Sequence, residues 1–152
     1  MINVKKAVNA DSRSSNDDFT QESLLKDTKS HITDVTRGMD FIAEELMARG
    51  PKHDNTKIKN INNFYEALKS GKVKESFWYN IHITEERHHL KSKAPEDVNL
   101  IDVIEHIVDC TMAGMSRSGT IYDVDLPGEL LEKAVANTVE LLKKNINVIE
   151  SR

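Results

Sequence analysis

The chain has few of the residues that mark several other classes of protein. It holds one cysteine, Cys110, so no disulfide can form within it, as is usual in a reducing compartment. Its three prolines and six glycines argue against collagen-like or low-complexity sequence. It also lacks any long apolar run, so we expect no transmembrane span and no signal peptide. Together these absences favour a cytoplasmic globular protein that does not contact a membrane.

An excess of positive charge is absent as well. The sequence has 21 Lys and Arg against 25 Asp and Glu, a formal net charge of −4. This balance argues against an extended nucleic-acid-binding surface, although it permits a small basic patch. The length of 152 residues is that of one ordinary domain with room for a real core.

Apolar residues recur at helical spacing through most of the chain, and no segment alternates convincingly as a strand would. We therefore predict an all-α fold, a bundle of about five helices. Residues 1–19 are rich in Asn, Asp and Ser and predict a loose arm, whereas residues 20–150 predict one domain. The predicted helices span about residues 20–49, 56–68, 73–90, 98–115 and 128–148.

Local signals mark some of the helix ends. The segment Asp18-Phe19-Thr20-Gln21 is a start signal for the first helix, and Gly50-Pro51 ends it. Asp97 is expected to cap the fourth helix. The last helix is amphipathic, so it can pack within the domain or against a second copy of the chain in a homo-oligomer.

The third predicted helix contains three histidines. At about 100° per residue, His82 and His89 share one face, with Glu85 and Glu86 between them. By the same arithmetic His88 points roughly 120° away from His82. The spacing favours His89 over His88 as the partner of His82 at a metal site, but a solvated polar face would have the same pattern.

Two further histidines precede this helix. His31 lies on the apolar side of the first helix, where a hydrogen-bonded core histidine is the alternative to a metal ligand. His53-Asp54 stands at the start of the second helix and can offer two ligands, or Asp54 or Asn55 can simply cap that helix. Lys57 follows Asp54 by one turn, where it can meet an anionic substrate or balance the carboxylate.

The fourth predicted helix has an apolar face and an acidic one. Asp109 falls on the acidic side with Asp102 and Glu105, where periodicity alone predicts solvated acids. The face expected to be buried consists of Leu100, Val103, Ile104, Ile107 and Thr111.

In chain order these residues resemble the HD-domain superfamily of metal-dependent phosphohydrolases, an all-α family named for a histidine, a His-Asp pair and a later aspartate. The segment 53–57, His-Asp-Asn-Thr-Lys, is similar to the family's H-D-x-x-K segment. The run from His82 to His89 is similar to a group of uncharacterised phage and bacterial HD-like proteins. The likeness covers about residues 30–119. The Gly-Tyr-Pro signature of cyclic-dinucleotide hydrolases is missing, so that activity is not implied.

The resemblance implies a divalent transition metal, one or two ions of Mn, Fe, Ni, Co or Zn. One ion would be held by His31, His53, Asp54 and Asp109. A second would be held by His82 and by His89 or His88, with Asp54 bridging. The implied substrate is a nucleotide or another small phosphorylated molecule.

The resemblance places Lys57 near the substrate, and the chemistry of a hydrolase suggests further roles around such a metal. Lys57 would sit near the phosphate, and Glu105 or Glu86 would carry a proton if either faces the site. Arg87 and Arg117 are candidate phosphate anchors, with a solubilising surface position as the alternative for each. Two other functions stay open: a di-iron HD-type oxygenase, and a non-catalytic binding or regulatory protein on the same scaffold.

Overall fold

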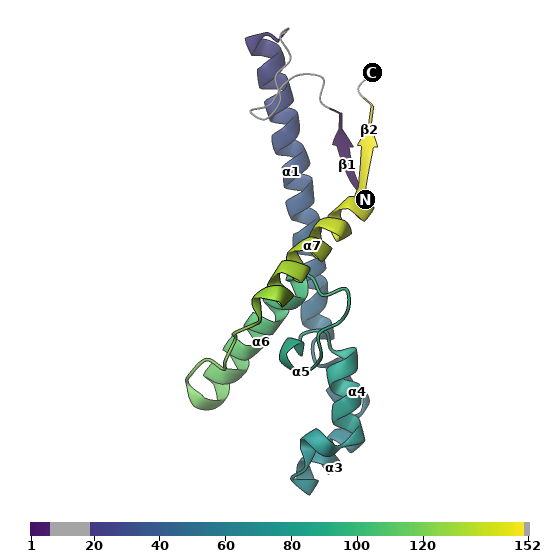
Figure 1. Ribbon diagram of the computed structural model, residues 1–152, viewed down its shortest axis with the longest axis vertical. Coiled ribbons are helices and arrows are strands. Elements are labelled where there is room, and N and C mark those ends of the chain that lie inside the picture. The colour runs from purple at the N-terminus through teal and green to yellow at the C-terminus, as the bar shows by residue number, and fades with distance from the viewer. Residues whose placement is uncertain (7–18, 151–152) are drawn as a thin grey trace. The chain divides into compact units, whose positions relative to one another are not determined.

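The structure is a computed structural model that describes residues 1–6 and 19–150. Helices make up most of it, and the two strands of the described part are short (Figure 1), which confirms the predicted all-α class. The chain divides into a first unit of residues 1–44 and 140–152 and a second unit of residues 45–139. The expectation of a single domain over residues 20–150 stays a prediction.

The first unit contains a small parallel sheet that the sequence analysis did not predict. Strand β1 (Ile2–Lys5) pairs in register with β2 (Ile146–Ile149), so that Ile2 lies opposite Ile146. The predicted arm is therefore ordered at residues 2–5, while its residues 7–18 fall outside the described part. The last helix ends at Asn145 instead of Val148, because β-branched residues alternating with Asn favour a strand over a helix.

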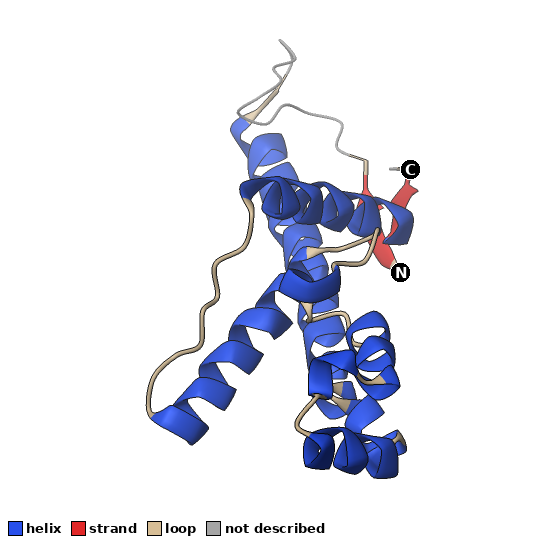
Figure 2. Ribbon diagram, turned by 60° about the horizontal axis from the view of Figure 1, so that its bottom comes forward, coloured by secondary structure: helices blue, strands red, loops and turns tan. Residues whose placement is uncertain are grey.

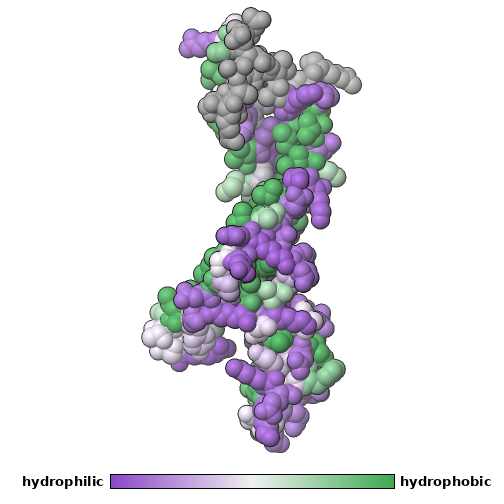
Figure 3. All heavy atoms as spheres, in the orientation of Figure 1, coloured by the Kyte–Doolittle hydropathy of each residue, from purple (hydrophilic) through white to green (hydrophobic). Residues whose placement is uncertain are grey.

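Helix α1 (Gln21–Arg49) agrees closely with the first predicted helix. At its start the backbone N–H of Ser23 donates to Oγ1 of Thr20 at 3.1 Å, whereas Asp18 of the expected start signal lies outside the described residues. At its end the short 3-10 helix η1 (Gly50–Lys52) carries Pro51, as the Gly-Pro signal predicts. Apolar side chains such as Val35 and Met39 are exposed on α1, and apolar patches interrupt the hydrophilic surface of the molecule (Figure 3).

In the second unit short helices precede two long ones, the last of which ends in the first unit, and loops join them (Figure 2). The predicted second helix is divided at Asn60, and the predicted third helix is broken more severely. The elements that follow η1 are α2 (Asn55–Lys59), α3 (Ile61–Ser70), η2 (Val73–Glu75), α4 (Phe77–Glu85), α5 (Leu90–Lys93), α6 (Leu100–Ser118) and α7 (Gly128–Asn145).

The break in the third predicted helix has a physical cause. The backbone turns extended at Glu86, and residues 86–89 form a turn between α4 and α5. The side chains of Glu86 and Arg87 each bond to groups outside this segment, on Thr56 and Asp102 respectively. These tertiary contacts outweigh the local helical preference. The continuous helix over residues 73–90 is therefore a wrong prediction.

Helix α6 begins two residues later than predicted. Asn99, not Asp97, is its N-cap, and it forms a capping box with Asp102. The predicted buried face is wrong for Ile104 and Ile107, which are 40% and 42% exposed, and the predicted solvated acid Asp102 is 0% exposed. The helix turns Asp102 inward because that carboxylate has arginine partners within the unit. The core consists of Leu90, Val98, Val103 and Ala134, with Leu100, Leu126 and Leu130 packed against it.

Among the described residues, no helix combines the length and the apolar character needed to cross a membrane.

Candidate metal centre

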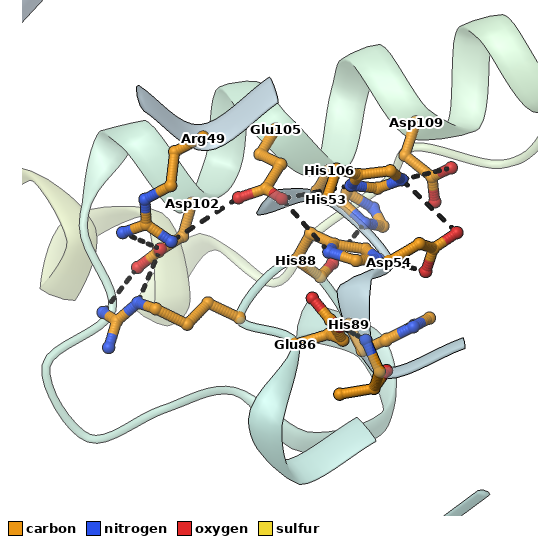
Figure 4. Close-up of polar contacts among 12 residues, drawn as sticks. Arg49, His53, Asp54, Glu86, His88, His89, Asp102, Glu105, His106 and Asp109 are labelled. Atoms are coloured by element: carbon orange, nitrogen blue, oxygen red, sulfur yellow. Dashed lines mark hydrogen bonds and ion pairs between the residues drawn. The ribbon is translucent and has the colours of Figure 1, made fainter. Parts of the chain in front are cut away.

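Four histidines of the second unit converge on Asp54, and two acids of α6 lie beside them. Figure 4 shows three of these histidines, His53, His88 and His89, around Asp54. Asp54 and the four histidines are supplied by helix ends or turns, whereas the two acids come from the interior of α6. His53 and Asp54 come from the turn before α2, His82 from the last turn of α4, His88 and His89 from the turn before α5, and Glu105 and Asp109 from α6.

Asp54 has an unusual backbone. It is the one non-glycine residue of the described chain with a positive φ, at φ 57° and ψ 20°. Left-handed backbone is unfavourable for residues with a Cβ, although Asp and Asn tolerate it best, and such strain is concentrated at functional sites. The carboxylate lies between the histidines, with Oδ1 at 3.5 Å from Nε2 of His82 and 3.7 Å from Nε2 of His88. That Oδ1 is buried without a hydrogen bond.

His88 is the most enclosed member of the cluster. Its ring is 1% exposed, and neither ring nitrogen makes a hydrogen bond. Nδ1 lies 3.3 Å from Oε1 of Glu105, without hydrogen-bond alignment, and Nε2 faces Asp54. A buried polar atom without a partner is costly and calls for an explanation such as a bound ion.

Two groups of three side chains have the spacing of a metal site, and His88 belongs to both. In each group the ligand atoms all lie within 4.8 Å of one another. Nitrogen and carboxylate oxygen together suit first-row transition metals. The residues present therefore fit the divalent metal that the resemblance implies. The groups are His53 with His88 and Glu105, and Asp54 with His88 and His89.

His82 and His89 extend the second group. Their Nε2 atoms lie 2.7 Å apart, and Nδ1 of His82 shares a hydrogen bond of 2.6 Å with the hydroxyl of Thr56. That bond leaves Nε2 of His82 to face His89 and Asp54, as an outer hydrogen bond does for a ligating histidine. Burial lowers the pKa of His82 and lowers the pKa of His89 to about 3, so both rings are neutral at pH 7, the form that binds metal.

His53 has the opposite charge state. Its Nε2 lies 3.4 Å from Oδ1 of Asp109, and its Nδ1 lies 3.1 Å from Oε1 of Glu105. The carboxylates of Asp109 and Glu105 raise the pKa of His53 to about 10. Without an ion, this ring is therefore an imidazolium at pH 7 that neutralises part of the acidic charge.

Two glutamates expected to carry a proton differ in their surroundings. Glu86 is buried, and its Oε1 accepts the backbone N–H of Thr56 at 2.7 Å, so it fixes the start of α2. Glu105 faces His53 and His88. Burial raises the pKa of Glu105, but these two histidines outweigh burial and bring that pKa down to about 2. Of these two glutamates, Glu105 is the one that belongs to a possible ligand group.

A partly buried ionic network centred on Asp102 supports the cluster from one side (Figure 4). Nε and Nη2 of Arg87 each lie 2.8 Å from an oxygen of Asp102, and Nη2 of Arg49 lies 3.1 Å from the same carboxylate. Arg49 also reaches Oε2 of Glu105 at 3.5 Å. The predicted phosphate anchor Arg87 is thus bound to internal acids. Arg49 was not expected at the site, because a cation in the last turn of a helix is ordinary.

A pocket of about 440 Å³ borders the cluster. Its volume lies in the range of small-molecule sites. His53, Glu105 and Asp109 contribute its polar edge, together with Arg49. Three exposed apolar residues of α6 therefore form part of the pocket wall. The apolar lining comes from Leu46, Ile104, Val108 and Met112.

Most of the predicted ligands are brought together. His53, Asp54 and Asp109 lie beside His82, His88 and His89, and Lys57 donates to Oδ2 of Asp54. His31 is exposed on α1 in the first unit, and neither described ligand group includes it. Arg117 is exposed in the last turn of α6.

His106, which was not expected at the site, contacts the backbone of His88. Its ring is 6% exposed, and its Nδ1 donates to the backbone carbonyl of His88 at 3.0 Å. This bond anchors the turn that carries His88 and His89. Its position on α6, four residues before Cys110 and beside Glu105, gave no sign of that contact in the sequence.

Comparison with protein-family models gave no match for this sequence, and neither curated proteins nor solved structures gave one. The interpretation of the site therefore depends on the geometry of its own residues.

Proposed function

We propose that this chain is an HD-type metal-dependent hydrolase of phosphate esters, which acts on a nucleotide or another small phosphorylated molecule in the cytoplasm. One observation supports this more than any other. The fully enclosed ring of His88 has two unsatisfied nitrogens, each directed at a carboxylate. A divalent cation between such groups would satisfy them together.

The Asp54 group is the first place for an ion. Asp54, His88 and His89 form the set, and Nε2 of His82 adjoins it. When bound, such an ion polarises a phosphoryl oxygen and lowers the pKa of a water molecule. The second group offers His53 and Glu105, so the geometry accommodates either one ion or two.

Lys57 is the cation best placed for a substrate phosphate. Its ammonium donates to Oδ2 of Asp54, and its side chain is 29% exposed. It holds the carboxylate in place and has further N–H groups for the oxygens of an anion. In the proposed reaction Lys57 offsets charge that develops on those oxygens.

Glu105 is the proposed proton carrier when a single ion occupies the Asp54 group. Its Oε1 is shared with Nδ1 of His53, and its Oε2 is buried without a hydrogen bond. The pKa of His53 is about 10 and that of Glu105 about 2, so the proton rests on His53, and Glu105 would take it up only in passing at the edge of the pocket. The apolar pocket walls would hold the part of the substrate that carries no phosphate, and exclude water from it.

The test is metal content by elemental mass spectrometry, followed by phosphate release from a nucleotide panel and p-nitrophenyl phosphate. Wild type should carry near-stoichiometric metal, and Asp54→Asn should lose it together with at least about a hundredfold in kcat/KM, since it removes an anionic ligand. Asp125→Asn, an exposed acid of the loop before α7, is the matched control and should keep both.

Other outcomes would redirect the proposal. Wild type that takes up no Mn, Fe, Ni, Co or Zn would overturn it and leave a binding scaffold. Two irons per chain with oxygen-dependent turnover would indicate the oxygenase instead. Normal function in the host of a His53→Ala, Asp54→Ala double variant would exclude both enzymes.

A further inference from the structure

The two strands of the first unit carry the same tripeptide. Ile2-Asn3-Val4 and Ile146-Asn147-Val148 pair in parallel and in register, and the side-chain amide of Asn147 donates to Oδ1 of Asn3 at 3.2 Å. Identical strands that pair in register stack like side chains on like, which is how identical segments of different chains also pair. An open edge of this sheet can therefore accept a further strand of the same sequence.

The hydrogen bond from the backbone N–H of Lys6 to the carbonyl of Ile149, at 3.0 Å, fixes which groups face outward. Successive residues of a strand direct their backbone groups to alternate sides. Ile149 and Asn147 therefore face β1. The backbone groups of Ile146 and Val148 point to the opposite edge of β2.

The outer edge of β1 is already closed by α1. Nη1 of Arg37 donates to the carbonyl of Asn3 at 2.9 Å, and the backbone N–H of Lys5 donates to Oδ2 of Asp34 at 3.4 Å. Arg37 and Asp34 also form an ion pair at 3.1 Å. In Figure 1, β1 accordingly lies between α1 and β2. No further strand can add on this side without breaking these contacts.

The outer edge of β2 has no such cover from the described residues. All four residues of β2 are exposed, and Val148 is 59% exposed. Within residues 1–6 and 19–150, no side chain bonds to the N–H or carbonyl of Val148. A two-stranded sheet is marginal alone, and natural proteins pair or block an open edge.

We infer that the free edge of β2 pairs with β2 of a second copy of this chain, antiparallel about a two-fold axis. The same strand then lies opposite itself, as a two-fold interface requires. With the axis at Asn147, Ile146 of each copy pairs with Val148 of the other, and every outward backbone group of β2 gains a partner. The result is a four-stranded sheet in the order β1-β2-β2-β1.

The closed outer edge of β1 favours a second copy of this chain as the partner of β2. Each outer edge of that sheet is a β1 edge, already closed by Asp34 and Arg37. The assembly therefore stops at two chains. A strand from an unrelated protein would pair with β2 as well, but it would not bring a closed edge of its own.

The mass in solution, by light scattering or sedimentation, is the first test. Wild type should have the mass of two copies of the 17.2 kDa chain. Val148→Pro removes the outward N–H and keeps pairing with β1, since proline is tolerated where the N–H faces away from the neighbouring strand. This variant should dissociate at least tenfold more readily, whereas the matched Val148→Thr should remain a dimer. A monomeric wild type, or a Val148→Pro variant that dimerises equally well, would overturn the inference.

Cross-linking tests the register, and it remains decisive even if Val148→Pro fails to fold. In a Cys110→Ser background, Asn147→Cys places two thiols at the axis, where Cα atoms are about 4.5 Å apart and a disulfide can form. Ile149→Cys on the same strand would place them about 13 Å apart. Mild oxidation should link the first variant and not the second. Equal linkage, or no linkage of the Asn147→Cys variant, contradicts the proposed sheet.

Discussion

Arg87 holds the carboxylate of Asp102 with two nitrogens, Nε and Nη2, at 2.8 Å each. This pair connects the turn that bears His88 and His89 to the helix that bears Glu105 and Asp109. Asp102 is 0% exposed, so its charge has no water to replace a lost arginine. The pair therefore fixes the distance between the two halves of the ligand cluster.

The first prediction concerns this pair. Arg87→Met leaves the buried carboxylate of Asp102 with Arg49 as its remaining cation, at 3.1 Å. We therefore expect the variant to lower the free energy of unfolding clearly, but by less than the about 3–5 kcal/mol that follows when a buried charge loses its one partner. Asp97→Asn is the matched control, because Asp97 contacts the same guanidinium with a side chain that is 78% exposed. That change should cost about 0–1 kcal/mol. Denaturant titration measures the free energy of unfolding of both variants. Equal losses would show that the two hydrogen bonds from Arg87 to Asp102 contribute no more to stability than the exposed ion pair with Asp97.

Replacing His88 should affect the stability of the metal-free protein and its stabilisation by metal in opposite directions. His88→Leu removes a buried ring with two unsatisfied nitrogens, so the metal-free variant should be at least as stable as metal-free wild type. It should also lose the rise in Tm that added metal produces in wild type. His106→Leu, at a buried histidine that does have a partner, should be less stable with or without metal. A metal-dependent rise in Tm for His88→Leu would remove His88 from the ligand set.

The pH dependence of the metal-free protein follows from His53. Asp109 and Glu105 raise its pKa to about 10, above the ordinary 6.5. Protonated His53 therefore stabilises the folded state. This contribution is fully present below pH 6.5 and is lost as the pH rises toward 10. Unfolding measured from pH 6 to pH 10 should therefore show a steeper loss of stability for wild type than for His53→Gln. Asp109→Asn should lie between them, since it removes the contact that contributes most. Identical slopes for wild type and His53→Gln would contradict this charge state.

Asp54 allows the backbone and the ligand to be separated. Asp54→Gly and Asp54→Ala both remove the carboxylate, so both should lose the metal. Their stabilities should differ, because glycine adopts the left-handed φ of 57° freely and alanine does not. We expect metal-free Asp54→Ala to be less stable than Asp54→Gly by about 1–2 kcal/mol in denaturant titration. Equal stabilities would mean that the turn relaxes when the carboxylate is removed.

The sequence was sufficient to predict the all-α class and the bounds of α1, because long helices are set by local periodicity and strong end signals. The nearness of His82 and His89 was also predicted, but it arises from a turn instead of a continuous helix. The same wrong helix placed His88 away from His82, although His88 is central to both ligand groups. That error follows from Glu86 and Arg87, whose partners are distant in the sequence.

The remaining differences have the same origin. Asp102 has the spacing of a solvated acid, and only the arrival of Arg49 and Arg87 makes its burial favourable. The strands were missed because a four-residue segment carries little local signal, and its pairing depends on a segment at the other end of the chain. Periodicity indicates the secondary structure that a segment prefers by itself. The burial of Asp102 and the pairing of the two strands depend instead on contacts with residues distant in the sequence.

The pairing of β1 with β2 has a consequence for folding. Ile2 is 5% exposed, yet its strand partner is Ile146. During synthesis β1 leaves the ribosome well before β2, because the helices of the described chain lie between the two strands in the sequence. Closing so long a loop costs entropy, so the sheet should form after the helices. Until then the apolar residues of β1 lack their partner strand, so β1 is open to pairing with other strands for that interval.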